Sequence, residues 1–112
     1  MQFKEKIEDD IVILSLKGNI MGGPDTQKLH EHIKFLIGKG HKKFVIDLGQ
    51  VKWLNSSGIG MLMASYSSIS NDKGSLILSR VTKKIRSLLI MTKILTFFQT
   101  TDSIDDAVAS LK

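Results

Sequence analysis

The most constraining feature of this sequence is a short apolar run near its middle, Phe44-Val45-Ile46-Asp47-Leu48. A nearly continuous apolar run of this length is typical of a central strand that is covered on both faces. Strands of this kind belong to parallel sheets, in which helices return the chain between neighbouring strands. The run therefore predicts an α/β domain with helical segments before and after it.

The spacing of apolar residues predicts four helices. Pro24 suits the first turn of the first helix, while Gly38 and Gly40 end it. Thr82 and Ser103 are placed to cap the third and fourth helices. The apolar stripes of the four helices are Leu29, Ile33, Leu36 and Ile37; Ile59, Leu62, Met63, Tyr66 and Ile69; Ile85, Leu88 and Leu89; and Ile104, Ala107, Val108 and Leu111.

Extended segments alternate with these helices. The β-branched run 11–16 ends at Lys17-Gly18 and is expected to pair with 2–7 in a hairpin. Two shorter extended pieces are predicted at 76–78 and 97–99. The order ββαβαβαβα, without repeat or linker, predicts one α/β domain over residues 1–112, with a mixed sheet of four to five strands and about four helices.

Composition narrows the cellular setting. The chain has no cysteine, no run of about 18 apolar residues and no apolar core of a signal peptide near Met1, so a cytoplasmic protein without membrane insertion is expected. The net charge of +5 comes from scattered basic residues, with Arg80, Lys83, Lys84 and Arg86 expected on one helix. A solvated surface is the favoured interpretation. Direct docking on nucleic acid or an anionic membrane is the alternative, although no aromatic residues interleave the basic ones.

The sequence indicates a protein without catalytic, metal or cofactor chemistry. His30 and His32 lie two residues apart on a helix and His41 lies in a loop, which is not metal-ligand spacing. No Gly-x-Ser-x-Gly elbow and no glycine-rich, lysine-bearing phosphate loop is present. A binding protein, not an enzyme, is therefore predicted, with no cofactor.

The segment that links the central strand to the second helix carries the functional information. In Asn55-Ser56-Ser57-Gly58-Ile59-Gly60, either Asn55 or Ser56 stands where a helix N-cap belongs. A phosphate on Ser56 would meet the free N–H groups and the positive end of the helix dipole. Gly58 and Gly60 are expected to leave the backbone open to a partner. A helix cap with no regulatory role is the alternative for Ser56.

From Asp47-Leu48 to Gly60 the sequence resembles the signature of the STAS domain, named for sulfate transporters and anti-sigma factor antagonists. The resemblance implies the STAS fold over essentially the whole chain. It also implies that the chain binds an anti-sigma factor that is a serine kinase, which phosphorylates Ser56 and so ends binding. A metal-dependent Ser/Thr phosphatase would reverse the modification. The family has a carboxylate before this serine where the chain has Asn55, which weakens the case for kinase recognition but keeps the cap.

The expected partner surface combines the helix at about 57–70 with the loop at 18–25. The resemblance implies that Leu54 is buried, whereas Trp53 is either a core residue or an interface anchor. The alternative function is a constitutive STAS adaptor subunit of a transporter ATPase or signalling complex that is never phosphorylated. The predicted partner-binding residues are Asn19, Met21, Gly22, Trp53, Asn55, Ser56, Ser57, Gly58, Ile59 and Met61.

Overall fold

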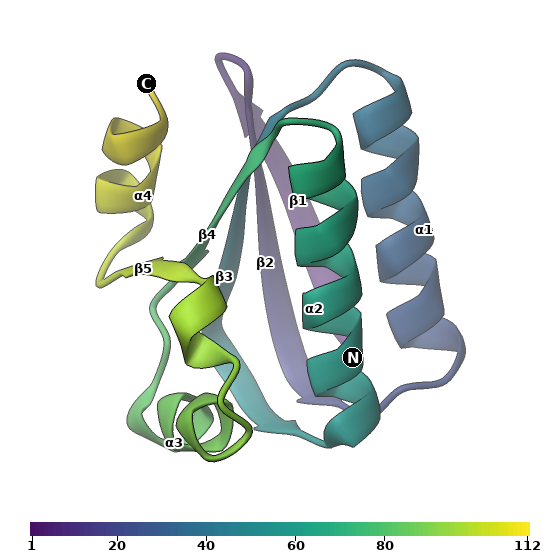
Figure 1. Ribbon diagram of the computed structural model, residues 1–112, viewed down its shortest axis with the longest axis vertical. Helices are drawn as coiled ribbons and strands as arrows, with labels where there is room; N and C mark the ends of the chain where they lie inside the picture. The colour runs from purple at the N-terminus through teal and green to yellow at the C-terminus, as the bar shows by residue number, and fades with distance from the viewer.

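The computed structural model describes residues 1–112 as a five-stranded sheet with helices on both faces (Figure 1). The strands are β1 (Gln2–Glu8), β2 (Ile11–Ile20), β3 (Lys43–Leu54), β4 (Ser75–Ser79) and β5 (Gln99–Thr101). The helices are α1 (Pro24–Gly38), α2 (Ser56–Asn71), α3 (Lys83–Met91) and α4 (Ile104–Leu111), with a short 3-10 turn, η1 (Leu95–Phe97), before β5.

The strands lie in the sheet in chain order, β1-β2-β3-β4-β5. The first hairpin is antiparallel, and the remaining pairs, β2 with β3, β3 with β4 and β4 with β5, are parallel. Each parallel pair is linked by a helical crossover, because the chain must return to the same end of the sheet. The predicted mixed sheet and the order ββαβαβαβα are confirmed.

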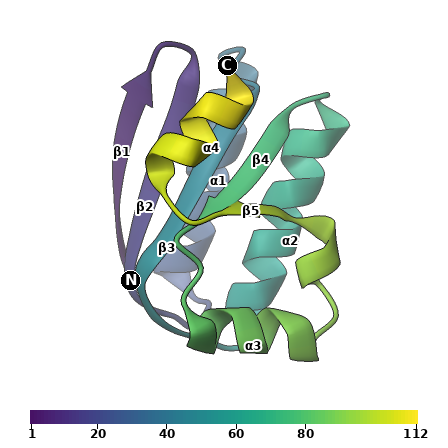
Figure 2. The same ribbon diagram turned by 90° about the vertical axis from the view of Figure 1, so that its left-hand side faces the viewer.

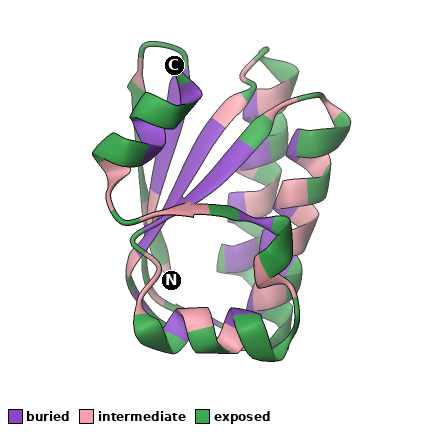
Figure 3. Cartoon of the chain, turned by 60° about the vertical axis from the view of Figure 1, so that its left-hand side comes forward, coloured by how far each residue is buried: buried purple, intermediate pink, exposed green.

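The two faces of the sheet carry unequal cores (Figure 3). Under α1, α2 and α3 lies a cluster of 20 buried residues, including Leu14, Phe44 and Leu62. A cluster of seven joins the sheet to α4 and includes Ile13 and Val45 of the sheet and Val108 of α4 itself. Alternate residues of β2 and β3 enter the two clusters, as the period of a strand requires. The central apolar run is therefore covered on both faces, as predicted.

Two strands extend further than the sequence indicates. The predicted end of one strand at Lys17-Gly18 is wrong, because β2 continues to Ile20; β3 likewise continues past Leu48 to Leu54. The pairing of β2 with β3 shifts register between Ser15 and Lys17 and again between Gly18 and Asn19, and β3 supplies an extra residue each time. These bulges interrupt the alternation of apolar residues, so the sequence pattern stops before the strand does.

The predictions at residues 97–99 and at Arg80 are also wrong in part. Phe97 belongs to η1, and the last strand begins at Gln99. Arg80 precedes α3 instead of lying on it, with φ at 54°. The caps of Thr82 and Ser103 are confirmed, because each side chain accepts a hydrogen bond from the first turn of its helix. No helix combines the length and the apolar character needed to cross a membrane.

Arg80 forms a two-pronged ion pair with Asp47 of β3. Its Nε lies 2.8 Å from Oδ1 and its Nη2 2.8 Å from Oδ2, while the Gly49 amide donates to the same Oδ1 at 3.0 Å. Burial alone would raise the pKa of Asp47, but hydrogen bonds from Arg80, the Gly49 amide and Ser15 outweigh it and hold that pKa below its usual value. The guanidinium covers Gly49 so closely that a Cβ there would lie 2.5 Å from Cζ of Arg80.

The first turn of α2 packs directly on the end of β2. A Cβ added to Gly58 would lie 2.2 Å from the carbonyl oxygen of Ile20, whereas one added to Gly60 would meet nothing within 4 Å. Only glycine at position 58 lets the helix approach this carbonyl.

The ion pair predicts a pH-dependent loss of stability. Asp47→Asn should lower the free energy of unfolding by about 1–3 kcal/mol at pH 7, because a buried charge-assisted pair is lost. Since the folded-state pKa is depressed, the pair stabilises the protein above about pH 4 and is lost as pH falls through the lower folded value. Urea unfolding from pH 7 to pH 3 should show the two proteins converging in acid, with exposed Asp102→Asn as the control. A gap that stays constant would contradict this role.

The close approach at Gly58 predicts opposite effects for two neighbouring glycines. Gly58→Ala should destabilise the protein by about 1–3 kcal/mol or more, because its methyl group collides with backbone. Gly60→Ala should stabilise it by about 0.5–1 kcal/mol, because alanine favours the helix and the site is open. Thermal and urea unfolding of both variants measure the difference. Equal effects at both positions would rule out the tight contact.

Candidate functional site

The candidate site lies at the carboxyl ends of β2 and β3, where α1 and α2 begin (Figure 1). Ile20 and Leu54 pair at the ends of the two parallel strands, and both are buried. The amide of Asn55 continues this contact by donating to the carbonyl of Ile20 at 3.2 Å. Parallel pairing thus places the loop after β2 beside the first turn of α2.

Asn55 joins that loop to the helix. Its Oδ1 accepts a hydrogen bond from the Gly58 amide at 2.8 Å, which makes Asn55 the N-cap of α2. Its Nδ2 donates to the carbonyl of Met21 at 2.7 Å. Of the two capping candidates in the sequence, Asn55 therefore holds the position and Ser56 does not. An aspartate would cap the helix equally well but could not donate to Met21.

Ser56 is exposed and is the first residue of α2. The amide of Gly58 donates to Oδ1 of Asn55 and the amide of Ile59 to its carbonyl oxygen. The amides of Ser56 and Ser57 have no partner within the helix, as is usual for a first turn. The first turn holds no acidic side chain, so nothing offsets the positive end of the helix dipole. An anionic group attached to Oγ of Ser56 would therefore be stabilised by the positive end of the helix dipole and would not disturb the core.

The loop between β2 and α1 lies against the same turn. Gly22 and Gly23 adopt φ values of 84° and 85°, a region that favours glycine. A Cβ on Gly22 would lie 2.6 Å from Cβ of Ser57, so any other residue would displace the loop or the helix. A hollow of about 330 Å³ lies beside this contact, between α1 and α2. It is lined by, among others, Ser57, Gly60 and His30.

Burial divides the predicted partner-binding residues. Asn19, Met21, Ser56 and Ser57 are exposed, while Gly22, Asn55 and Ile59 are partly exposed. Trp53 is 39 % exposed, with Lys84 Nζ 5.0 Å from its ring centroid, and Leu54 is buried as expected.

Two of the predicted contact residues require correction. Met61 is 5 % exposed and packs in the larger core. Gly58 is buried against Ile20, so its backbone is closed and not open to a partner. Both residues support the site from beneath. The buried position of Met61 follows from the helical period, which places it one turn before Ser65 on the inner side.

The histidines serve local contacts. Nε2 of His30 lies 3.4 Å from Oγ of Ser68, and His32 contacts the carboxylate of Glu5. No group of three or more His, Cys, Asp or Glu side chains is arranged to hold a metal ion.

The chain resembles known proteins along nearly its full length. BtrV of Bordetella bronchiseptica, named as an anti-sigma factor antagonist, is 22% identical over 104 residues, which are 93% of this chain and 89% of BtrV. A Thermotoga maritima structure described in the same terms has a TM-score of 0.88 at 24% identity, covering 97% of this chain and 93% of the other.

Two further structures share the fold. Bacillus SpoIIAA in its phosphorylated form has a TM-score of 0.78 at 14% identity and covers 99% of this chain and 100% of its own. A sulfate transporter family protein of Wolinella succinogenes has a TM-score of 0.75 at 16% identity, covering 95% of this chain and 88% of the other. At these identities the structures establish the fold alone.

The STAS domain model matches residues 2–107, which include all five strands and the first half of α4. The match therefore covers both the sheet and the Asn55–Gly60 turn, and the chain belongs to the STAS domain family.

Proposed function

We propose that this protein is an anti-sigma factor antagonist that acts in the cytoplasm and is switched by phosphorylation of Ser56. In the unphosphorylated state it binds an anti-sigma factor that is also a serine kinase, and so allows a sigma factor to act. The observation that carries the proposal is the exposed hydroxyl of Ser56 at the first position of α2, in a turn without acidic side chains.

The proposed reaction transfers the γ-phosphoryl group of ATP to Oγ of Ser56, releasing ADP and the hydroxyl proton. The kinase supplies the catalytic groups. A metal-dependent phosphatase reverses the step by hydrolysis, in which one water takes up the phosphoryl group as inorganic phosphate and the serine hydroxyl is restored. The added charge of about −1.5 to −2 sits on the partner surface, where repulsion and desolvation weaken binding without a change of fold. The exposed and partly exposed members of the predicted set form that surface: Asn19, Met21, Gly22, Trp53, Asn55, Ser56, Ser57 and Ile59.

The similarity to BtrV and to the phosphorylated form of SpoIIAA supports this proposal. The absence of a carboxylate at Asn55 and the likeness to a sulfate transporter family protein favour a second candidate, a constitutive adaptor in which Ser56 is never modified. The two candidates differ in whether Ser56 accepts phosphate and in whether the phosphorylated protein releases its partner.

Incubation with the cognate anti-sigma factor kinase and ATP should place one phosphate on Ser56, as read by mass spectrometry. Ser56→Ala should accept none and keep its affinity for the kinase. Ser56→Asp should bind at least about tenfold more weakly, because a charge enters the interface. Ser110→Ala, at an exposed position of α4 outside the proposed surface, is the matched control and should behave as wild type in both assays. Equal binding of all four proteins with no phosphate incorporated would instead establish the adaptor.

The two hydrogen bonds of Asn55 predict separable effects. Asn55→Asp keeps the cap but loses the donor to Met21, so the free energy of unfolding should change by less than about 1 kcal/mol while amides 21–23 exchange faster. Asn55→Ala loses both bonds and should cost about 1–3 kcal/mol. Urea unfolding and amide hydrogen exchange measure the two effects. Wild-type exchange of residues 21–23 in the aspartate variant would show that the side-chain amide does not hold the loop.

A further inference from the structure

One face of the sheet is covered by α4 over only part of its length. The two turns of α4 cross only the upper part of β2 and β3 (Figure 2) and pack on Ile11, Ile13, Val45 and Ile77. Further along the strands the same face continues with polar side chains, among them Ser15 and Gln50. These polar side chains do not offer the continuous apolar stripe on which a helix packs.

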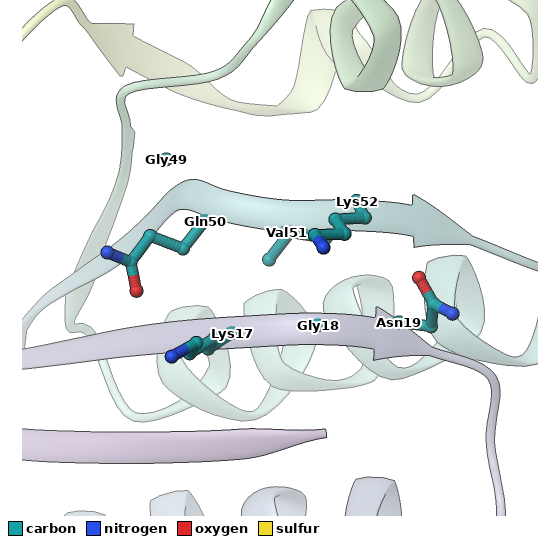
Figure 4. A pocket seen from close by; sticks show the side chains of 7 residues that line it. All are labelled: Lys17, Gly18, Asn19, Gly49, Gln50, Val51 and Lys52. Atoms are coloured by element: carbon teal, nitrogen blue, oxygen red, sulfur yellow. The ribbon is translucent and has the colours of Figure 1, made fainter.

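Two adjoining hollows follow this uncovered face. The larger, about 530 Å³, lies at the bulged ends of β2 and β3 (Figure 4). The smaller, about 300 Å³, continues it across β1 and shares Lys17 and Gln50 with it. Gln2, Lys17 and Gln50 are paired in one row across the three strands. We call the two hollows together the basic trough; its lining is Gln2, Phe3, Lys4, Ser15, Lys17, Gly18, Asn19, Gly49, Gln50, Val51 and Lys52.

The positive charge of the basic trough is not compensated. Lys4, Lys17 and Lys52 line it, and none of them forms an ion pair. No acidic residue lines either hollow. The nearby carboxylate of Asp47 has a side chain only 3% exposed and is already bound by Arg80. Carboxylates return only in the adjoining hollow, where Glu5, Glu8 and Asp105 lie with Lys4. Within the basic trough itself, an anionic ligand would meet three ammonium groups that form no ion pair.

We infer that the basic trough binds an acidic, extended segment of the protein that docks at Ser56. This inference rests on the proposed function for the existence of that partner. The trough is elongated, and lysines on flexible stems suit a row of carboxylates that has no fixed geometry. A nucleotide base finds no platform there, because the one aromatic lining residue, Phe3, packs its ring against His32 of α1.

The basic trough also continues into the candidate site. Asn19 lines the trough and directly precedes Ile20 and Met21 of the loop. Lys52 lines it on β3, four residues before Ser56. A partner bound at the first turn of α2 therefore has the trough within reach around the end of the sheet.

An NMR titration of the full chain with a synthetic peptide of alternating Glu and Ser tests the inference without the kinase. Amide signals of Lys17–Asn19 and Gly49–Lys52 should shift and saturate. The double variant Lys17→Glu with Lys52→Glu should weaken binding at least about tenfold, because two attractive charges become repulsive. In the wild type, affinity should fall steeply between about 50 and 300 mM salt, as screened surface charges require.

The matched control is Lys28→Glu with Lys34→Glu, which makes the same change of net charge on exposed positions of α1. It should alter peptide affinity by less than about twofold, since screening limits the reach of distant charges. Equal losses in the two double variants would overturn the inference, because only net charge would matter. Tighter binding of ATP than of the peptide at the same amides would also overturn it in favour of a nucleotide site. Because neither probe uses the kinase, a failure of Ser56 phosphorylation is a separate result.

Discussion

The contact between Gly58 and the carbonyl of Ile20 determines the geometry of the whole Ser56 edge. It lets the first turn of α2 pack directly on the end of β2. The parallel pairing of Ile20 with Leu54 fixes where along the strands that turn begins. Asn55 then has both the helix and the loop within hydrogen-bond distance. Ser56 is therefore exposed on a helical turn that is fixed to the sheet by Gly58 and to the loop by the side chain of Asn55.

A second fixed point lies on the opposite face, where Arg80 covers Gly49 and binds Asp47. The pair ties the residue after β4 to the middle of β3, just before β3 bulges. The bulges turn Gln50 and Lys52 toward the uncovered face while Val51 and Leu54 stay in the larger core. One strand thus supports the serine at its end and the basic trough along its side.

Much of the fold could be predicted because its signals are local. Helical period, the caps at Thr82 and Ser103, and the apolar run at 44–48 each report on a few neighbouring residues. The bonds that complete the site could not be predicted in this way. Arg80 and Asp47 lie 33 residues apart, and Asn55 and Met21 lie 34 apart, so no pattern along the chain links them. The burial of Met61 follows from its position four residues before the buried Ser65 on α2. Its place directly after the STAS-like turn Asn55–Gly60 pointed instead to the partner surface.

The inequality of the two cores has a consequence for the order in which the molecule opens. The cluster that joins α4 to the sheet has seven buried residues, three of them on α4 itself, against 20 on the other face, so α4 is held by far less apolar contact than α1 and α2. Local unfolding should begin at α4 and should leave the sheet covered on its other face by α1, α2 and α3. In such a partly open form the carboxyl ends of β2 and β3 and the first turn of α2 keep their packing, because that packing belongs to the larger core.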